Sequence, residues 1–258
     1  MIEPFLGLWI LDPTTCVYGS RPVPRRGSYH LTPGEQGVSA RVWWVDAEGE
    51  SRSVAFEMIV DGEARPLPDG SSLVCRVDGG ELVSEVVRDG LVVHGARRIP
   101  SEDGRSLLVV QTFGPEERIE ATYRRCLEGT KQVLLYRRDL NMRKGKIAAQ
   151  IAHASLKVLL DRDEGSWDRL VIPLDEAMAS WTRARFAKIV LSVETEEDLV
   201  RVYEEARARG LPTALVTDAG HTEFHGVPTR TTVAIGPALA AAIDAITGPS
   251  GLVPTKLA

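Results

Sequence analysis

DLNMRKGKIAAQIAHA, residues 139–154, decides the fold of the second half of this chain. Just before it, residues 132–136 (QVLLY) form a short apolar run, which is typical of a strand buried on both faces. After it, four alanines and the i, i+4 pair Ile147 and Ile151 predict a helix over residues 144–160. The stretch therefore predicts a strand, a turn and a helix, with small residues that let the helix lie close to its sheet.

The turn between this strand and this helix is strongly cationic. It places five basic residues within ten positions against the single Asp139: Arg137, Arg138, Arg143, Lys144 and Lys146. Because a helix N-terminus already carries partial positive charge and unpaired N–H groups, these cations would be repelled unless an anion lies there. The pattern favours a phosphate-bearing ligand, and the alternative is a solvated basic turn.

Length and composition indicate a globular chain of two domains. The 258 residues are 43% hydrophobic and 26% charged, and no run is long and apolar enough to span a bilayer. The first residues, MIEPFLGLWILDPTT, lack the basic and apolar regions of a secretory signal. Cys16, Cys75 and Cys126 are widely separated, which argues against a disulfide framework and a zinc knuckle. We expect a cytoplasmic protein with no membrane partner.

Charge divides the chain unevenly. Residues 1–129 contain no lysine, and their 14 Arg against 20 Asp and Glu give a net charge of −6. Residues 130–258 have 17 Lys and Arg against 16 Asp and Glu, a net charge of +1. A near-neutral half with one concentrated basic turn fits local phosphate binding better than a surface that coats a nucleic acid.

The first half predicts antiparallel β-structure. Short alternating or apolar runs recur over residues 28–31, 38–45, 53–60, 73–77, 81–87, 91–99, 106–113 and 118–125. Asp-Gly pairs between several of them, at Asp61, Asp78, Asp89 and Asp103, supply the positive φ that tight hairpins need. Eight or more hairpin-connected strands most economically close into an up-and-down barrel.

A Gly-x-Trp motif at Gly7 and Trp9, followed by YGSRPVPRRGSYHL, resembles the opening of lipocalin-like small β-barrels. We therefore predict a lipocalin-like all-β antiparallel barrel domain over residues 1–128. Such barrels bind a small apolar ligand or are filled by their own side chains, and both alternatives stay open. Trp43 and Trp44 point to opposite faces of one strand, so only one of them can be interior.

The second half, residues 130–258, alternates strands and helices. Further strands are predicted over residues 187–193, 211–217 and 231–235, and helices over 174–180, from Thr195 to Gly210, and from Pro237 to Gly248. The connection between the last two strands is too short for a crossover helix, so that pair is antiparallel. The expected architecture is an α/β three-layer sandwich with a four-stranded mixed sheet.

A polar loop, residues 218–232 (DAGHTEFHGVPTRTT), follows the third strand of this half. Open α/β sheets bind ligands beyond their strand ends. There Asp218 could orient or deprotonate a water, while Thr222 and Thr231 could hold that water or an oxyanion. The alternative is an Asp turn whose hydroxyls only satisfy the backbone.

Four stretches of this half, RRDLNMRKGKIAAQIAHA, FAKIVLSVETEEDL, GLPTALVTDAGHTEF and VAIGP, resemble the second class of peptidyl-tRNA hydrolases in order and spacing. This class is typical of archaea and eukaryotes, and the resemblance covers residues 131–248. It implies hydrolysis of the ester that links a peptide, or an N-blocked amino acid, to the 3′ ribose of tRNA. It also implies a compact α/β fold that is often a homodimer, with no cofactor and no metal.

The resemblance carries over residue by residue. It implies a catalytic set of Lys146, Asp218, Thr222 and Thr231, and a substrate-binding set of Arg138, Arg143, Lys144, Gln150, His153 and His221. In this interpretation Asp218 and Thr222 position a water, and Lys146 stabilises the oxyanion or the neighbouring 3′ phosphate. Arg143 and Lys144 hold the acceptor stem. For His153 we favour packing against the sheet over a catalytic role.

Departures from the family's pattern leave the substrate open. Asn141 replaces a lysine, Arg143 replaces a glycine, and the second loop has His221 where the family has Arg or Lys and is one residue longer. His221, Glu223 and His225 alternate, so an extended backbone would place them on one side, but three ligands make a weak metal site and we expect none. The alternative function is a repurposed, non-catalytic binding protein. It would use the α/β domain for a nucleotide or protein and the barrel for a small apolar ligand.

Overall fold

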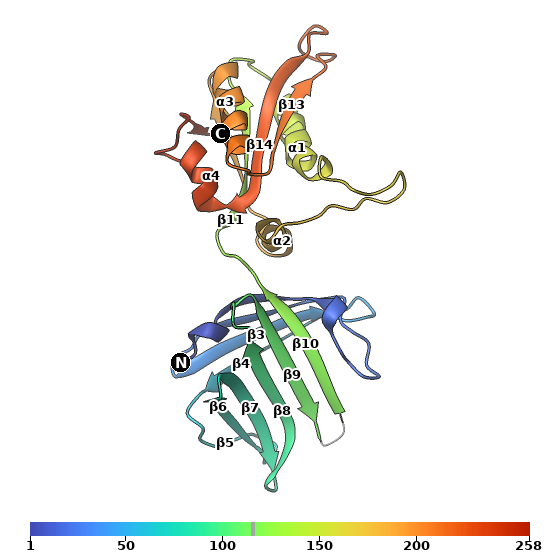
Figure 1. Cartoon of the computed structure of the whole chain (residues 1–258), viewed down its shortest axis with the longest axis vertical. Helices are drawn as coiled ribbons and strands as arrows, with labels where there is room; N and C mark the ends of the chain where they lie inside the picture. The colour runs from blue at the N-terminus through green and yellow to red at the C-terminus, as the bar shows by residue number, and fades with distance from the viewer. Residues whose placement is uncertain (115–116) are drawn as a thin grey trace. The chain divides into compact units, whose positions relative to one another are not determined.

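The N-terminal unit, Met1–Cys126, is a single antiparallel sheet that curls into a half-barrel (Figure 1). The computed structural model describes residues 1–114 and 117–258. The strands of this sheet are β1 (Gly7–Leu11), β2 (Arg26–Pro33), β3 (Gly37–Val45), β4 (Ser51–Ile59), β5 (Arg65–Pro66), β6 (Ser72–Asp78), β7 (Glu81–Arg88), β8 (Leu91–Pro100), β9 (Ser106–Phe113) and β10 (Glu117–Arg125). Two short 3-10 helices, η1 (Glu3–Phe5) and η2 (Pro13–Thr15), flank β1.

Strand order confirms the predicted antiparallel meander. The order is β4-β3-β2-β1-β10-β9-β8-β7-β6-β5, so β1 to β4 and β5 to β10 each follow one another as in the sequence, and the pairing of β1 with β10 joins the two runs. Hydrogen bonding between strands, as far as the structure describes the chain, ends at β4 and β5 without closing the sheet. The predicted barrel is therefore a curled half-barrel.

Trp9 anchors the core of this unit. Its side chain is fully buried, and its indole N–H donates to the Phe5 carbonyl at 2.8 Å. The Arg125 guanidinium lies 4.1 Å from the centre of the Trp9 ring and donates to the backbone carbonyls of Leu6 and Pro4. The cation–π contact and these hydrogen bonds join β10 to Trp9 and to the segment that precedes β1. They explain the tryptophan of the Gly-x-Trp motif.

The C-terminal unit, Leu127–Ala258, is a three-layer α/β sandwich. Its elements are β11 (Thr130–Arg137), α1 (Lys144–Leu160), α2 (Glu176–Arg183), β12 (Lys188–Val193), α3 (Glu196–Ala208), β13 (Thr213–Asp218), β14 (Thr229–Leu239), α4 (Ala240–Thr247) and β15 (Lys256–Leu257). The sheet order is β13-β14-β11-β12-β15. Only β11 and β12 are parallel, so the predicted mixed sheet is confirmed, and the two-residue β15 adds a fifth strand.

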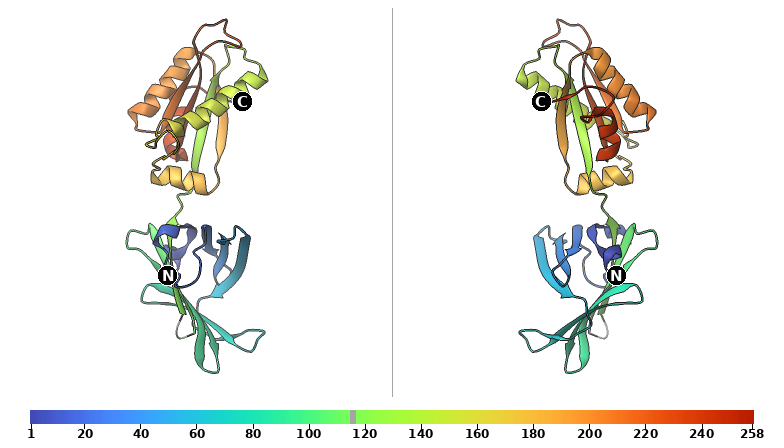
Figure 2. Two further views of the ribbon diagram at one scale, coloured as in Figure 1. Left: turned by 90° about the vertical axis from the view of Figure 1, so that its right-hand side faces the viewer. Right: turned by 90° about the vertical axis from the view of Figure 1, so that its left-hand side faces the viewer.

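Central strand β11 is buried on both faces, as its apolar run predicted. Leu134 packs with α1 on one face, while Val133 and Leu135 pack with α3 and α4 on the other. Figure 2 shows α1 and α3 on opposite sides of the sheet. Helix α2 begins two residues later than predicted because the Asp175 carboxylate caps it, accepting from the Met178 N–H. Across the described residues, no helix is long and apolar enough to cross a membrane.

Replacing Leu135 by alanine tests this packing. The side chain is completely buried at the centre of the sheet, so we expect the C-terminal unit to lose about 2 to 5 kcal/mol of unfolding free energy. Native-state hydrogen exchange of the β11 amides measures that loss. Leu170→Ala, at a side chain that is 59% exposed, is the matched control and should change it by less than about 0.5 kcal/mol. Equal effects of both substitutions would contradict the described core.

Candidate active site

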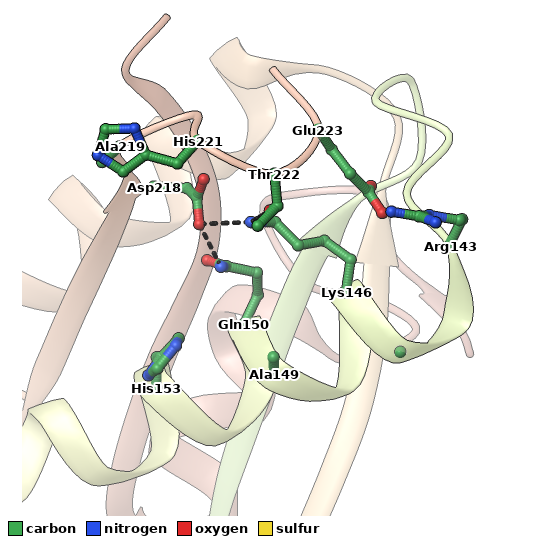
Figure 3. Close-up of a pocket in the computed structure, with 11 residues that line it drawn as sticks. Arg143, Lys146, Ala149, Gln150, His153, Asp218, Ala219, His221, Thr222 and Glu223 are labelled. Carbon is green, nitrogen blue, oxygen red and sulfur yellow. Dashed lines mark hydrogen bonds and ion pairs between the residues drawn. The ribbon is translucent and has the colours of Figure 1, made fainter. Parts of the chain in front are cut away.

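Helix α1 presents three polar side chains on one face: Lys146, Gln150 and His153 (Figure 3). Their spacing of four and three residues places them one above the other along the helix. Ala154 and Val158 follow Gln150 at four-residue spacing, and these three residues form the buried side of the helix, where Ala154 and Val158 pack on the sheet. Arg143 is the N-cap residue, and its side chain makes no capping bond, so the first turn keeps its N–H groups available.

Asp218 ends β13 and faces this helix. The Gly220 N–H donates to its Oδ1 at 2.8 Å, forming a tight turn directly after the strand. Gly220 has a φ of +84°, and a Cβ added there would lie 2.5 Å from the Val227 carbonyl oxygen. Only glycine fits this position, which explains the DAG sequence.

The centre of the site is an ion pair between Lys146 and Asp218. The Lys146 Nζ donates to Asp218 Oδ2 at 2.6 Å, and the two side chains are only 11% and 14% exposed. The same Nζ donates to the Thr222 hydroxyl at 2.8 Å. The structure thus brings together three of the four residues expected to be catalytic.

Thr231, the fourth, lies behind Gln150. In a regular strand Thr231 and Thr232 would point to opposite faces of the sheet. The register between β13 and β14 shifts here, because Val216 lies opposite Thr232 and the next residue of β13 lies opposite Arg230. This irregularity lets both threonines reach Gln150: Thr231 donates to its Oε1 at 2.6 Å and Thr232 to its backbone carbonyl at 3.2 Å.

The Gln150 side chain links Thr231 to the ion pair. Its Nε2 donates to Asp218 Oδ2 at 2.6 Å, and its Oε1 accepts from the Thr231 hydroxyl. A carboxylate only accepts hydrogen bonds, so the amide must turn its nitrogen to Asp218, and the threonine fixes its other end. Thr231 is completely buried, so its hydroxyl orients Gln150 from behind.

Asp218, Lys146 and Thr222 each keep one hydrogen-bonding position that no group in the described part of the chain uses. A carboxylate accepts about four hydrogen bonds, and Asp218 accepts three, from Lys146, Gln150 and the Gly220 N–H. One acceptor position on Oδ1 is left for a water. Lys146 uses two of its three N–H donors, and the Thr222 hydroxyl, which accepts from Lys146, keeps its own proton to donate.

These contacts keep Asp218 ionised. The hydrogen bond from the Lys146 ammonium holds the pKa of the Asp218 carboxyl below its usual value of 3.8. The Gly220 N–H and the Gln150 amide act in the same direction, while partial burial opposes them. Lowering the pKa of a carboxylate weakens it as a base, so Asp218 is better suited to orient a water than to remove its proton unaided.

Most of the expected site residues surround one hollow of about 680 Å³. Seven of the ten line it: Arg143, Lys146, Gln150, His153, Asp218, His221 and Thr222. His153 is exposed and lines the hollow, so the packing interpretation is wrong. The helical register turns it toward the loop after β13 instead of toward the sheet.

Two expected substrate-binding residues lie elsewhere. Arg138 pairs with Glu194 at 3.3 Å and does not line the hollow. Lys144 lies on another side of α1, where it borders an apolar groove that includes Ile151 and Trp181. Helical periodicity separates Lys144 from Lys146, because residues two apart face different sides of a helix, but the sequence gives no information on where Arg138 points in the turn.

The loop after β13 adds contacts that sequence reasoning missed. Glu223 accepts from the Arg143 Nε at 2.6 Å, and the Lys146 Nζ lies 5.4 Å from the centre of the Phe224 ring. In the sequence, the alternation of His221 with Glu223 raised the alternative that these side chains bind a metal ion together. Within the residues that the structure describes, no group of three or more His, Cys, Asp or Glu is placed to hold a metal ion.

A carboxylate with an open acceptor position beside an ammonium and a hydroxyl, at the strand end of an α/β sheet, fits a hydrolytic site. Comparison with known proteins identifies the family. The family model described as "Peptidyl-tRNA hydrolase PTH2" matches residues 130–252. The chain is 39% identical over 118 residues to "Peptidyl-tRNA hydrolase" of Methanocaldococcus jannaschii, covering 46% of this chain and 95% of that protein. The chain belongs to the PTH2 family through its C-terminal unit.

Another relative matches a similar share of this chain. "Probable peptidyl-tRNA hydrolase 2" of Drosophila melanogaster is 40% identical over 118 residues, which are 46% of this chain and 59% of that protein. Solved structures similar to the N-terminal half include the following two. The fluorescent protein UnaG has 18% identity and a TM-score of 0.32, and the Echinococcus granulosus fatty-acid-binding protein 1 has 15% and 0.33. Each covers 48% of this chain and 99% of the solved one.

The Lys146–Asp218 pair predicts a definite pH dependence. Because the pKa of Asp218 is lowered in the folded state, the pair stabilises the protein above pH of about 4 and is lost as the pH falls through the lowered value. Carboxyl-carbon NMR titration of Asp218 should give a pKa below 3.8, and Lys146→Met should raise it. A pKa for Asp218 that Lys146→Met leaves unchanged would contradict the described pairing.

Proposed function

We propose that this protein hydrolyses the ester bond between a peptide, or an N-blocked amino acid, and tRNA, releasing free tRNA. The observation that carries this proposal is the Lys146–Asp218 pair with an unused acceptor on the carboxylate and an unused donor on the ammonium, in a chain of the PTH2 family. The relatives named above are peptidyl-tRNA hydrolases by name. A site that only binds would not need this pairing of acceptor and donor.

The site's unused groups match the steps of ester hydrolysis. Asp218 Oδ1 accepts a hydrogen bond from a water and orients its lone pair toward the ester carbonyl carbon, and Thr222 donates to the same water or to the carbonyl oxygen. As the carbon–oxygen bond forms, the third N–H of Lys146 donates to the developing oxyanion. The intermediate then collapses and the bond to the ribose 3′ oxygen breaks. The water proton that is hydrogen-bonded to Asp218 ends on that oxygen, and the other proton stays on the carboxyl group of the released peptide, which loses it to solvent.

Gln150 and Thr231 act by positioning in this proposal. Gln150 donates to Asp218 Oδ2, so it keeps the carboxylate turned with Oδ1 toward the hollow. Thr231 holds the far end of the same amide. Arg143, which is 79% exposed at the rim, is placed to contact a phosphate of the acceptor end.

The partners and location beyond the tRNA substrate are also proposals. We propose that the N-terminal unit is an accessory to the hydrolase, that its inner face takes a small apolar ligand, and that the active form is a cytoplasmic homodimer. Native mass spectrometry of the full chain tests the bound ligand and the homodimer. A monomer without any retained small molecule would argue against both.

Single-turnover hydrolysis of N-acetylaminoacyl-tRNA by the full-length protein tests the function. We expect wild type to cleave the ester, and Asp218→Asn and Lys146→Ala each to lower the rate by about 10²-fold or more, since each removes a group that acts on the reacting atoms. Lys157→Ala is the matched control on the same helix. Its ammonium pairs with Asp161 in solvent, about three turns along the helix from Lys146.

The result that would overturn the proposal is a wild-type protein that leaves the ester intact while binding tRNA. That outcome would favour the alternative of a repurposed binding protein. Activity that survives both Asp218→Asn and Lys146→Ala would instead place the reaction at another site.

Thr231→Val separates positioning from direct catalysis. The substitution keeps the shape of the side chain and leaves Gln150 Oε1 without its donor, so the amide can turn and release Asp218. We expect kcat to fall about fivefold to tenfold, the effect of one lost hydrogen bond, with KM nearly unchanged. Gln150→Glu should not rescue it, because a carboxylate at that position would repel Asp218. A loss as large as that of Asp218→Asn would show that Thr231 does more than position.

A further inference from the structure

The ion pair between Arg143 and Glu223 closes one side of the hollow. Glu223 Oε1 accepts from the Arg143 Nε at 2.6 Å, and Figure 3 shows the two side chains meeting at the rim, beside Lys146 and Thr222. The Glu223 side chain is 14% exposed, whereas that of Arg143 is 79% exposed. The carboxylate is therefore held inside the site, and the guanidinium reaches to it from solvent.

This carboxylate changes the charge of the hollow. The Lys and Arg that line it are Arg143 and Lys146, and the Asp and Glu that line it are Asp218 and Glu223, so the formal charges cancel. Each cation is already paired, Lys146 with Asp218 and Arg143 with Glu223. A site that takes the end of a polyanion would gain affinity from unpaired cations, so the second pair opposes binding.

The loop that carries Glu223 is braced independently of Arg143. The Gly220 carbonyl accepts from the N–H groups of Phe224 and Gly226, and Val227 donates to the Phe224 carbonyl. The Phe224 ring also lies beside Lys146. Glu223 is thus held in place by its own loop, while the exposed arginine is free to exchange its partner.

We propose that Glu223 determines the affinity of this site for tRNA by competing with a substrate phosphate for Arg143. In the free enzyme the carboxylate occupies the guanidinium, and a phosphate near the 3′ end of the tRNA displaces it. The Arg143 end of this pair is exposed, and ion pairs that solvent reaches are weak, so the exchange is easy in both directions. The product carries the same phosphate, so Glu223 also speeds the release of deacylated tRNA. This inference rests on the proposed function for the identity of the ligand.

Binding of deacylated tRNA, followed by fluorescence anisotropy of the full-length protein, tests the exchange without requiring hydrolysis. We expect Glu223→Gln to tighten binding about twofold to fivefold, the factor that corresponds to a surface ion pair. The slope of log Kd against log salt should steepen by up to about 0.9, because Arg143 gains one phosphate contact. Arg143→Gln should weaken binding, and Glu223→Gln should have no further effect in the Arg143→Gln background.

Glu205→Gln is the matched control for the removal of one negative charge. Glu205 pairs with Arg209 at 3.7 Å on α3, which packs on the face of the sheet opposite α1. Its substitution should leave the tRNA affinity within experimental error. Glu223→Ala should tighten binding in the same direction as Glu223→Gln, which excludes an effect peculiar to the amide.

Three outcomes would overturn the inference. The first is weaker or unchanged binding by Glu223→Gln, which would make the pair a brace for the loop. The second is an equal gain in the Arg143→Gln background, which would place the effect elsewhere. The third is a wild-type protein that does not bind tRNA, which would show that tRNA is not the ligand of this site. A wild type that fails to hydrolyse the ester but shows the predicted coupling would overturn only the proposed function.

Discussion

The ion pair between Lys146 and Asp218 is the interaction on which the rest of the site depends. Removing two charges from water is costly, and attraction compensates only when the remaining hydrogen-bonding groups are satisfied. The protein supplies a backbone N–H from Gly220 and an amide from Gln150, and it leaves one acceptor position on Asp218 and one N–H of Lys146 for water or substrate. The helical register, the glycine turn and the irregular register of β14 each place one of these partners. The local distortions of the fold therefore cluster around one carboxylate.

Much of this arrangement was readable from the sequence because it depends on short-range pattern. The apolar run before the basic turn predicted β11, and the alanine-rich segment predicted α1 with its correct boundaries. Asp218 was found because it begins a polar loop at the end of a predicted strand. Lys146 and Gln150 fall four residues apart, so helical periodicity alone placed them on one face. The family resemblance added the function expected of these residues, which periodicity does not supply.

What the sequence did not yield depends on contacts between distant segments. The burial of Thr231 behind Gln150 arises from a register shift between β13 and β14, and register is set by tertiary packing. His153 was assigned to the sheet because the direction of the helix face was unknown. Strands β5 and β15 have two residues each, too few for an alternating pattern. The pairing of Glu223 with Arg143 joins residues 80 positions apart.

The position of β1 in the N-terminal sheet has a consequence for synthesis on the ribosome. Strand β1 pairs with β2 on one edge and with β10 on the other. The first partner is made soon after it, but the second follows roughly 110 residues later, which takes about 5 to 20 s at typical elongation rates. During that interval one edge of β1 has no strand to pair with, and Trp9 lacks the arginine that later covers its ring. The nascent chain therefore has a defined period in which its first strand is open to a chaperone or to another chain.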